Sequence, residues 1–317
     1  MPPIPPTPLI VETLRDLVLP AAGGAALILG LFLTLGRWAG CLGSAAAVVA
    51  GFVWANFTLD TGGEAAGAIE WERTSRIIPW LPDKPTWHSL PRAALVLVLV
   101  GLASRGLGLI AHRALSDRWW WVERLLVWVP RWVALLVVGS WVMPVPWAEA
   151  YPWSKAALAA TMLLSWVVLD GTARGGAGSQ VALALAAMFF AAGGVTIFAH
   201  SKLFMDAAVV LGAAFFGIAV IARVGRVDAS GAIPAGVAFL PALLVNARYQ
   251  SESLVPLSAF WLVGLAPLAL LPGLIPRVGR LHPLILGAGR MILVLIPLFI
   301  AVELAMANEQ LPPPEEW

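Results

Sequence analysis

The chain has 317 residues, of which 60% are hydrophobic and only 12% charged, and its mean hydropathy is +0.86. This composition excludes a water-soluble domain, because soluble domains carry about twice that charged fraction. The formal net charge of +2 indicates no nucleic-acid partner, because the basic residues stand at the ends of apolar segments rather than in one patch. The sequence therefore predicts an all-α, polytopic membrane protein whose first partner is the lipid bilayer.

Ten apolar segments are long enough, or nearly so, to cross a bilayer as helices of about 20 residues each. They use most of the chain, which leaves room for one integral membrane domain over residues 1–317. The segment 233–245 is short and contains Pro234 and Pro241, so the alternative is a re-entrant segment there and nine spans in total. In chain order, the ten expected spans cover residues 17–35, 39–59, 91–110, 131–147, 154–169, 180–198, 203–222, 233–245, 254–275 and 284–305.

The second span carries a small residue at every fourth position, which places these residues on one face of a helix. In lipid, small side chains let two helix backbones approach closely, so this face is expected to pack against another helix. The alternative is that alanine and glycine are simply frequent in this chain. The predicted packing face consists of Gly43, Ala47, Gly51 and Ala55.

The longest polar interval, residues 60–90, is the expected extramembrane loop. Its charged residues stand among Trp71, Trp80 and Trp87, and tryptophan is enriched in the headgroup layer of a membrane. Residues 64–78 contain no proline and are expected to form a helix on the membrane surface. The alternative is a lid or a docking surface, but an interfacial segment accounts for the composition more simply.

A basic and aromatic stretch, residues 112–130, follows the third span. Its arginines fall on one helical face and its tryptophans occupy other angles. This pattern predicts an amphipathic helix at the membrane interface that ends at Pro130. Arg131, at the start of the fourth span, and Arg290, in the tenth, would then extend their long side chains to the headgroups.

A glycine-rich turn over residues 171–179 divides the spans into two groups of five, residues 1–170 and 180–305. An odd number of spans in each half makes the two halves inverted relative to each other, a design that many transporters use. Prolines interrupt the fourth, eighth and ninth spans. Because broken helices expose backbone groups that need a ligand or a cavity, these spans are expected to mark a substrate site.

The arginines and lysines set the expected orientation, because basic residues concentrate in cytoplasmic loops. Most of them stand at span ends that share one face of the membrane, among them Arg37, Arg113, Arg223 and Arg277. This distribution predicts that both termini are extracytoplasmic. The chain is tryptophan-rich, with 16 tryptophans, and arginine is much commoner than lysine. From this composition we expect a protein of the bacterial inner membrane.

Few ionisable residues lie inside the expected spans, and each is a candidate for function because a charge in the membrane is costly. His200, Asp206 and Glu303 stand near the expected outer ends of spans, and Arg290 stands deeper. The functional hypothesis is that the first three line an outer vestibule and that Arg290 lines a deeper cavity for a small polar or anionic solute. The alternative is that surface ion pairs and interfacial contacts satisfy all four.

No motif in the sequence indicates catalysis or a bound cofactor. The single cysteine, Cys41, excludes a disulfide or a cysteine-rich metal centre within the chain. The histidines stand at span ends or in loops, whereas haem ligands in a helical bundle are expected inside the spans. We therefore expect no cofactor, no metal and no catalytic residue, and a membrane-embedded enzyme is the least favoured alternative. The four histidines are His88, His112, His200 and His282.

The sequence predicts a function only through its architecture. A bundle of about ten spans without catalytic motifs is typical of a small-solute permease. The alternative is a structural or accessory subunit of a larger homo-oligomer or hetero-oligomer, in which the tryptophan-rich surfaces contact partners. A central cavity lined by polar atoms would favour the permease, whereas a solid core with a broad small-residue face would favour the subunit.

Overall fold

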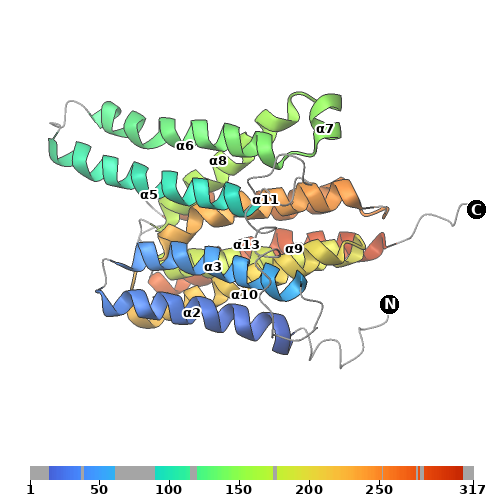
Figure 1. Cartoon of the computed structure of the whole chain (residues 1–317), viewed down its shortest axis with the longest axis horizontal. Coiled ribbons are helices and arrows are strands. Elements are labelled where there is room, and N and C mark those ends of the chain that lie inside the picture. The colour runs from blue at the N-terminus through green and yellow to red at the C-terminus, as the bar shows by residue number, and fades with distance from the viewer. Residues whose placement is uncertain are drawn as a thin grey trace, which may run out of the picture.

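The chain folds into an all-helical bundle (Figure 1). The structure is a computed structural model, which describes residues 14–36, 39–60, 90–114, 120–173, 177–251, 253–275, 278 and 282–309. Among these residues there is no β-strand. The surface helix expected at residues 64–78 and nearly all of the 60–90 loop lie outside the described residues.

Eight helices in the described part of the chain are long and apolar enough to cross a membrane, and two shorter apolar helices, Leu19–Thr34 and Gly40–Gly51, accompany them. The predicted membrane helical bundle is therefore confirmed, while the number of crossings stays a prediction. In chain order the helices are η1 (Leu14–Val18), α2 (Leu19–Thr34), α3 (Gly40–Asp60), α5 (Leu90–Ala114), α6 (Trp120–Val142), α7 (Val145–Ala150), α8 (Ser154–Thr172), α9 (Gly178–Phe198), α10 (Lys202–Gly225), η6 (Ser230–Ala232), α11 (Ile233–Gln250), α12 (Leu257–Leu265), η7 (Ala266–Leu274) and α13 (Pro283–Ala307).

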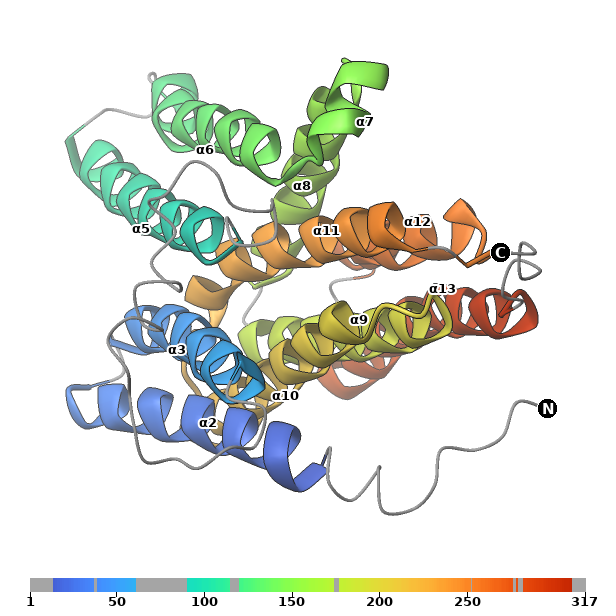
Figure 2. The ribbon, with the colours of Figure 1, turned by 45° about the vertical axis from the view of Figure 1, so that its right-hand side comes forward.

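The helices form two groups with a line of helices between them, which Figure 2 separates. One group contains α5, α6, α7 and α8, and the other contains α2, α3, α9, α10 and α13. The line of α11 and α12 runs between the groups. In both views α2 begins and α13 ends at the same end of the bundle, which we call the terminal end (Figures 1 and 2). The other end, where α10 ends and α11 begins, is called the far end.

The fourth span differs from the prediction. α6 is one continuous helix from Trp120 to Val142. The prediction of a separate interfacial helix that ends at Pro130 is therefore wrong. A proline inside a helix removes one backbone hydrogen bond and bends the helix. In lipid, however, no water competes for the remaining backbone groups, so the helix continues past the proline. Arg131, expected at the membrane boundary, consequently lies in the middle of α6.

The eighth span is longer than predicted and lies at the centre of the bundle. A helical stretch covers Ser230–Gln250, which is 21 residues, and 94% of its apolar window is buried. Pro234 stands in the first turn of α11, where its missing N–H breaks no helical hydrogen bond, and Pro241 lies inside the helix. This length is enough to cross a bilayer, so a re-entrant segment is not needed to account for it.

The ninth span changes helix type halfway, in agreement with its prolines. α12 ends at Leu265, and the chain continues as a 3-10 helix over Ala266–Leu274. Pro267 and Pro272 lack the N–H groups that would continue an α-helix. A 3-10 stretch of nine residues is unusually long, so this span is a broken helix.

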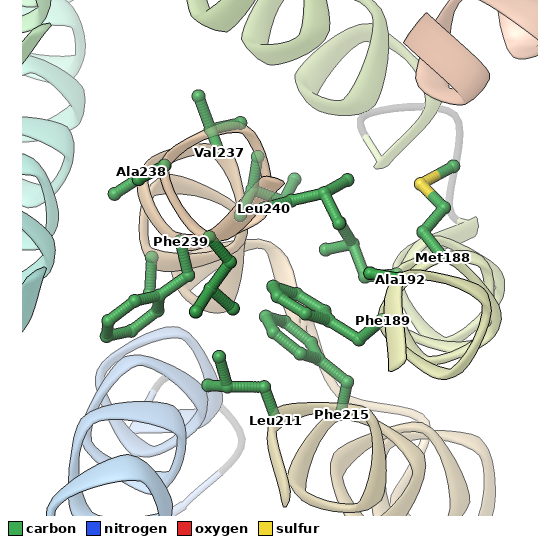
Figure 3. Packing of buried hydrophobic residues seen from close by; sticks show 14 of the residues in the cluster. Met188, Phe189, Ala192, Leu211, Phe215, Val237, Ala238, Phe239 and Leu240 are labelled. Atoms are coloured by element: carbon green, nitrogen blue, oxygen red, sulfur yellow. The ribbon is translucent and has the colours of Figure 1, made fainter. Parts of the chain in front are cut away.

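Aromatic and branched side chains from α9, α10 and α11 form the core of the bundle (Figure 3). The Phe189 ring of α9 stacks on the Phe215 ring of α10, with centroids 5.3 Å apart and planes inclined by 10°. Leu211 of α10 and Leu240 of α11 lie beside this pair, and Phe239 of α11 belongs to the same buried cluster. The contact of these three helices is solid apolar packing, so a solute site has to lie elsewhere.

Small residues bring α3 close to neighbouring helices of the same chain. A Cβ atom built on Gly43 would meet α2 at 2.6 Å, and one built on Gly51 would meet α10 at 3.1 Å. Ala47, between them, is fully buried. The side chain of Ala55 lies outside the described part of the chain. Gly43 and Gly51 therefore pack inside the bundle rather than facing a partner.

The tightest of these approaches is at Gly231, where a Cβ atom would lie 1.8 Å from the carbonyl oxygen of Cys41 on α3. Gly231→Ala is expected to lower the free energy of unfolding by about 1–3 kcal/mol, because α3 or the start of α11 has to shift. Unfolding in SDS-containing micelles, followed by tryptophan fluorescence, measures this change.

Gly30→Ala on α2 is the matched control, because nothing lies within 4 Å of its Cβ position. Alanine is a better helix former than glycine, so this change is expected to be neutral or to stabilise by at most about 1 kcal/mol. Equal stabilities for the Gly231 and Gly30 variants would contradict the expected clash.

Candidate functional site

A buried cluster of three charged side chains joins α5, α6 and α8. Arg105 Nη2 donates to Oδ1 of Asp170 at 2.8 Å, and Arg131 Nη1 donates to Oδ2 at 2.9 Å. The side chains of Arg131 and Asp170 are 0% and 2% exposed, and that of Arg105 is 26% exposed. Two guanidinium groups thus share one carboxylate. We call Arg105, Arg131 and Asp170 the Arg–Asp–Arg cluster.

A hydroxyl and two aromatic rings also contact Arg131. Its Nε donates to Ser104 Oγ at 2.8 Å, and Ser104 in turn donates to a carbonyl oxygen of its own helix at 3.0 Å. The guanidinium lies over the rings of Trp128 and Trp166, 4.7 and 4.8 Å from their centroids. These contacts offset part of the hydration that the cation loses on burial.

Arg105 also ties the cluster to the connection between α10 and α11. Its Nη1 lies 3.3 Å from Oδ2 of Asp228, donates to Ser230 Oγ, and lies 3.4 Å from the sulfur of Cys41. Asp228 accepts the backbone N–H of Ser230 at 2.9 Å. Three helices and one connection are therefore held together at the far end of the bundle.

The expectation that Arg131 reaches the headgroups is wrong, because its side chain is fully buried. Sequence reasoning also missed Arg105 and Asp170 as an intramembrane pair. Arg105 lies inside the expected third span and Asp170 directly after the expected fifth span, but neither was considered as a partner of the other; their helices run to Ala114 and Thr172. A sequence signal for this pair existed: burying a charge in a membrane is costly, so a charged residue inside a long apolar helix predicts a partner of opposite sign.

The four residues of the predicted solute site do not meet at one point. His200, Asp206 and Glu303 lie toward the terminal end, whereas Arg290 lies near the beginning of α13. Arg290 and Glu303 are therefore about 20 Å apart along the helix axis, at about 1.5 Å per residue. His200 and Glu303 are exposed and Asp206 is buried. The vestibule stays a prediction, and none of the four residues lines either of the two cavities described below.

Arg290 packs against the broken ninth span. Its Nη2 donates to the carbonyl oxygen of Gly273 at 3.1 Å, and its Nη1 donates to Oε1 of Gln180 at 3.3 Å. The side chain is only 7% exposed, so protein groups rather than headgroups receive its hydrogen bonds, contrary to the prediction. Gly273 lies in the last turn of η7, where carbonyl groups lack helical donors. Arg290 thus satisfies the backbone of a broken helix.

A cavity of about 440 Å³ lies between the α6–α8 segment and the α11–α12 segment, toward the terminal end. Its walls are mostly apolar, and Trp147, Phe260 and Trp261 contribute aromatic rings. Polar side chains are few, and they include Ser154 and Arg248. We call this space the aromatic cavity.

Three segments that prolines mark in the sequence meet at the aromatic cavity. Met143 lies directly after α6 and before Pro144, Pro241 interrupts α11, and Gly264 precedes the 3-10 half of the ninth span. A Cβ atom built on Gly264 would meet only Leu244, at 3.6 Å, so this glycine keeps one wall open. The irregular parts of the fourth, eighth and ninth spans are therefore side by side in space.

A second cavity of about 490 Å³ lies toward the far end, between α9, α10 and α13. Its polar side chains include Ser179, Gln180 and Arg223, and Gln180 is the residue that accepts a hydrogen bond from Arg290. This cavity shares no lining residue with the aromatic cavity. The two spaces are therefore separate sites on different helices.

In the described ranges, no three His, Cys, Asp or Glu side chains lie close enough together to hold a metal ion. No known protein family, curated protein or solved structure matches the chain. The function therefore has to follow from the geometry of the bundle and its cavities.

Proposed function

We propose that this protein is a membrane permease that takes up a small solute through the aromatic cavity. One observation carries the proposal: the three proline-marked segments line the same cavity, with Pro241 on α11 and Gly264 on α12. Irregular backbone inside a membrane is tolerated where it lines a cavity, and transporters place their solute sites at such helix breaks. The aromatic cavity is accordingly the solute site of the proposed permease.

The size and lining of the cavity support this assignment. Small-molecule pockets commonly enclose roughly 300–1,000 Å³ and combine apolar walls with a few polar groups. The aromatic cavity, at about 440 Å³ with Arg248 among its rings, falls in that range. It lies away from the solid contact of α9, α10 and α11, so the proposal does not need a polar channel through the core.

The distribution of basic residues supports an orientation. Four of the arginines that the whole sequence assigns to the cytoplasmic face under the positive-inside rule lie at the far end, whereas the described basic residues Arg15, Arg92, Lys155, Lys202 and Arg248 lie at the terminal end. The aromatic cavity then faces the extracytoplasmic side of a bacterial inner membrane, and the solute enters from that side. The four arginines at the far end are Arg113, Arg124, Arg223 and Arg226.

The Arg–Asp–Arg cluster supports a mechanism of alternating access. Helices α8 and α11 and Met143, directly after α6, line the aromatic cavity, and the cluster holds α6 and α8 together at the far end. Arg105 also binds Asp228 and Ser230 just before α11 begins. A transporter closes one end while the other is open, and these contacts close the cytoplasmic end of the proposed permease.

The subunit alternative has less support. It would be favoured by a small-residue face on the outside of the bundle, but Gly43 and Gly51 pack against α2 and α10 of the same chain. Association into a homo-oligomer or hetero-oligomer stays a prediction that the permease proposal does not require.

Uptake into proteoliposomes tests the proposed function. The purified chain is reconstituted into phosphatidylcholine vesicles, and a defined mixture of organic anions, organic cations, zwitterions and neutral solutes is added outside. Mass spectrometry then measures which solutes the vesicles retain. We expect one chemical class to be retained above the level in protein-free vesicles, with saturable kinetics. Equal retention with and without protein for every solute would contradict a permease.

A further inference from the structure

We infer that the ligand of the aromatic cavity is a small amphipathic organic anion, whose anionic group binds Arg248 and whose apolar body lies between aromatic rings. The inference rests on the proposed function, which makes this cavity the solute site, and it adds the chemical class of the solute. The charge of the lining, a buried hydroxyl without a partner and the arrangement of the rings carry it.

Arg248 gives the cavity a positive lining. It stands in the last turn of α11 and is half-buried, and none of the lining residues is acidic. No carboxylate of the described residues pairs with Arg248. A guanidinium presents a planar fork of N–H donors that fits a carboxylate or phosphate group. A ligand anion completes this side of the cavity.

A hydroxyl group in the wall also lacks a partner. Ser154 Oγ is buried and makes no hydrogen bond to any described residue, whereas the hydroxyl of the lining threonine, Thr161, donates to the carbonyl oxygen of Ala157 at 2.9 Å. Buried polar atoms are rarely left unsatisfied, so an oxygen of a bound ligand is the expected acceptor. Ser154 is also the first residue of α8, and the first turn of a helix favours negative charge.

The aromatic rings define the place of the apolar body. Trp147 contacts Tyr249 edge to face with centroids 5.9 Å apart, and Tyr151 contacts Trp153 at 6.2 Å, so the rings support one another. Trp153 and Trp261 are 67% and 41% exposed, which places them at the rim of the cavity. Aromatic faces bind flat rings and short alkyl chains through burial of apolar surface.

The same features exclude other classes of solute. A cation would be repelled by Arg248, and a sugar would find few polar side chains to replace its hydrogen bonds to water. A volume of about 440 Å³ is near the lower limit for small-molecule pockets, which favours a body of one ring or one short chain. A monocarboxylate with a single aromatic ring meets all of these conditions.

Equilibrium binding in nanodiscs tests the inference. The full chain is placed in phosphatidylcholine nanodiscs, and the dissociation constants of phenylbutyrate and of its neutral amide, phenylbutanamide, are measured by equilibrium dialysis. We expect the carboxylate to bind at least about tenfold more tightly than the amide, the ratio that corresponds to one charge-assisted contact. Equal affinity for the two probes would overturn the assignment of an anionic ligand.

Two arginine variants locate the anion. Arg248→Gln is expected to weaken phenylbutyrate binding about tenfold and to leave the affinity for the amide unchanged within about twofold. Arg223→Gln, in the second cavity, is the matched control and is expected to change neither affinity. Unchanged phenylbutyrate affinity in a folded Arg248→Gln protein would overturn the role of this residue, and the SDS unfolding transition checks that the variant is folded.

Further arms separate the possible sources of the anion and separate this inference from the proposed function. If phosphatidylglycerol in the nanodisc displaces phenylbutyrate, a lipid headgroup is the occupant, and the assignment to a water-soluble solute is overturned. Binding of phenylbutyrate without uptake into proteoliposomes would contradict the permease and leave the ligand class standing. Uptake of cations or zwitterions without phenylbutyrate binding would overturn the ligand class and leave the permease standing.

Discussion

Asp170→Asn is expected to lower the free energy of unfolding by about 3–5 kcal/mol, the cost of removing one partner from a buried ion pair. Asparagine has nearly the shape of aspartate, so packing is kept while the charge that balances Arg131 is removed. The Asp170 and Arg131 side chains are 2% and 0% exposed, and water therefore screens this charge poorly. Unfolding in SDS-containing micelles, followed by tryptophan fluorescence, measures the loss.

Asp228→Asn is the matched control, because Asp228 contacts the same Arg105 but its side chain is 52% exposed. Exposed ion pairs contribute little, so this change is expected to cost less than about 1 kcal/mol. The double variant Arg131→Met with Asp170→Leu removes the buried pair as a unit, and it is expected to recover most of the loss. Equal losses for Asp170→Asn and Asp228→Asn would contradict a buried cluster that holds the far end together.

Hydropathy alone located most of the helices. The sixth span was expected at residues 180–198, and α9 covers Gly178–Phe198. The tenth was expected at residues 284–305, and α13 covers Pro283–Ala307. These predictions succeed because the cost of exposing backbone and polar groups to lipid depends only on local sequence. The end of such a helix is visible wherever the apolar run meets glycine, proline or charge.

Charged residues inside the helices could not be placed by the same reasoning. Arg105 and Asp170 are 65 positions apart, and their contact depends on how α5 and α8 pack. A charge that interrupts an apolar run looks like a boundary unless its partner is known, so the fifth span was expected to end at residue 169, directly before Asp170, whereas α8 continues to Thr172. Pro130 misled the prediction in a similar way: the fourth span was expected to begin at residue 131, whereas α6 begins at Trp120, because a helix in lipid continues through a proline.

The aromatic cavity was predictable only in part. Prolines identified the irregular fourth, eighth and ninth spans, and these segments do line one cavity. Arg248 was assigned to a loop, because the eighth span was expected to end at residue 245, whereas α11 continues to Gln250. Ser154 carries no sequence signal of its own. Its position in the wall depends on the packing of α8 against α11, which no local pattern encodes.

Gly264→Phe is expected to lower the initial rate of solute uptake by at least about tenfold, which corresponds to a loss of about 1.4 kcal/mol of binding free energy. A Cβ atom at Gly264 meets only Leu244, at 3.6 Å, so a phenylalanine side chain there can extend into the aromatic cavity without striking the backbone. The added ring occupies the space that the solute needs.

Gly289→Phe on α13 is the matched control, because nothing lies within 4 Å of its Cβ position and it lines neither cavity. This variant adds the same ring to another membrane helix and is expected to leave uptake within about twofold of the unchanged protein, since surface substitutions rarely exceed about 0.5 kcal/mol. Both variants are expected to unfold at the SDS fraction of the unchanged protein or above it, because glycine is the weaker helix former.

The measurement that tests the solute site most directly is uptake into proteoliposomes by the unchanged protein, the Gly264→Phe variant and the Gly289→Phe variant in parallel. If the aromatic cavity is the solute site, uptake is lost in the Gly264 variant alone, although the protein remains folded. Equal uptake by all three proteins would contradict the assignment of the solute to this cavity.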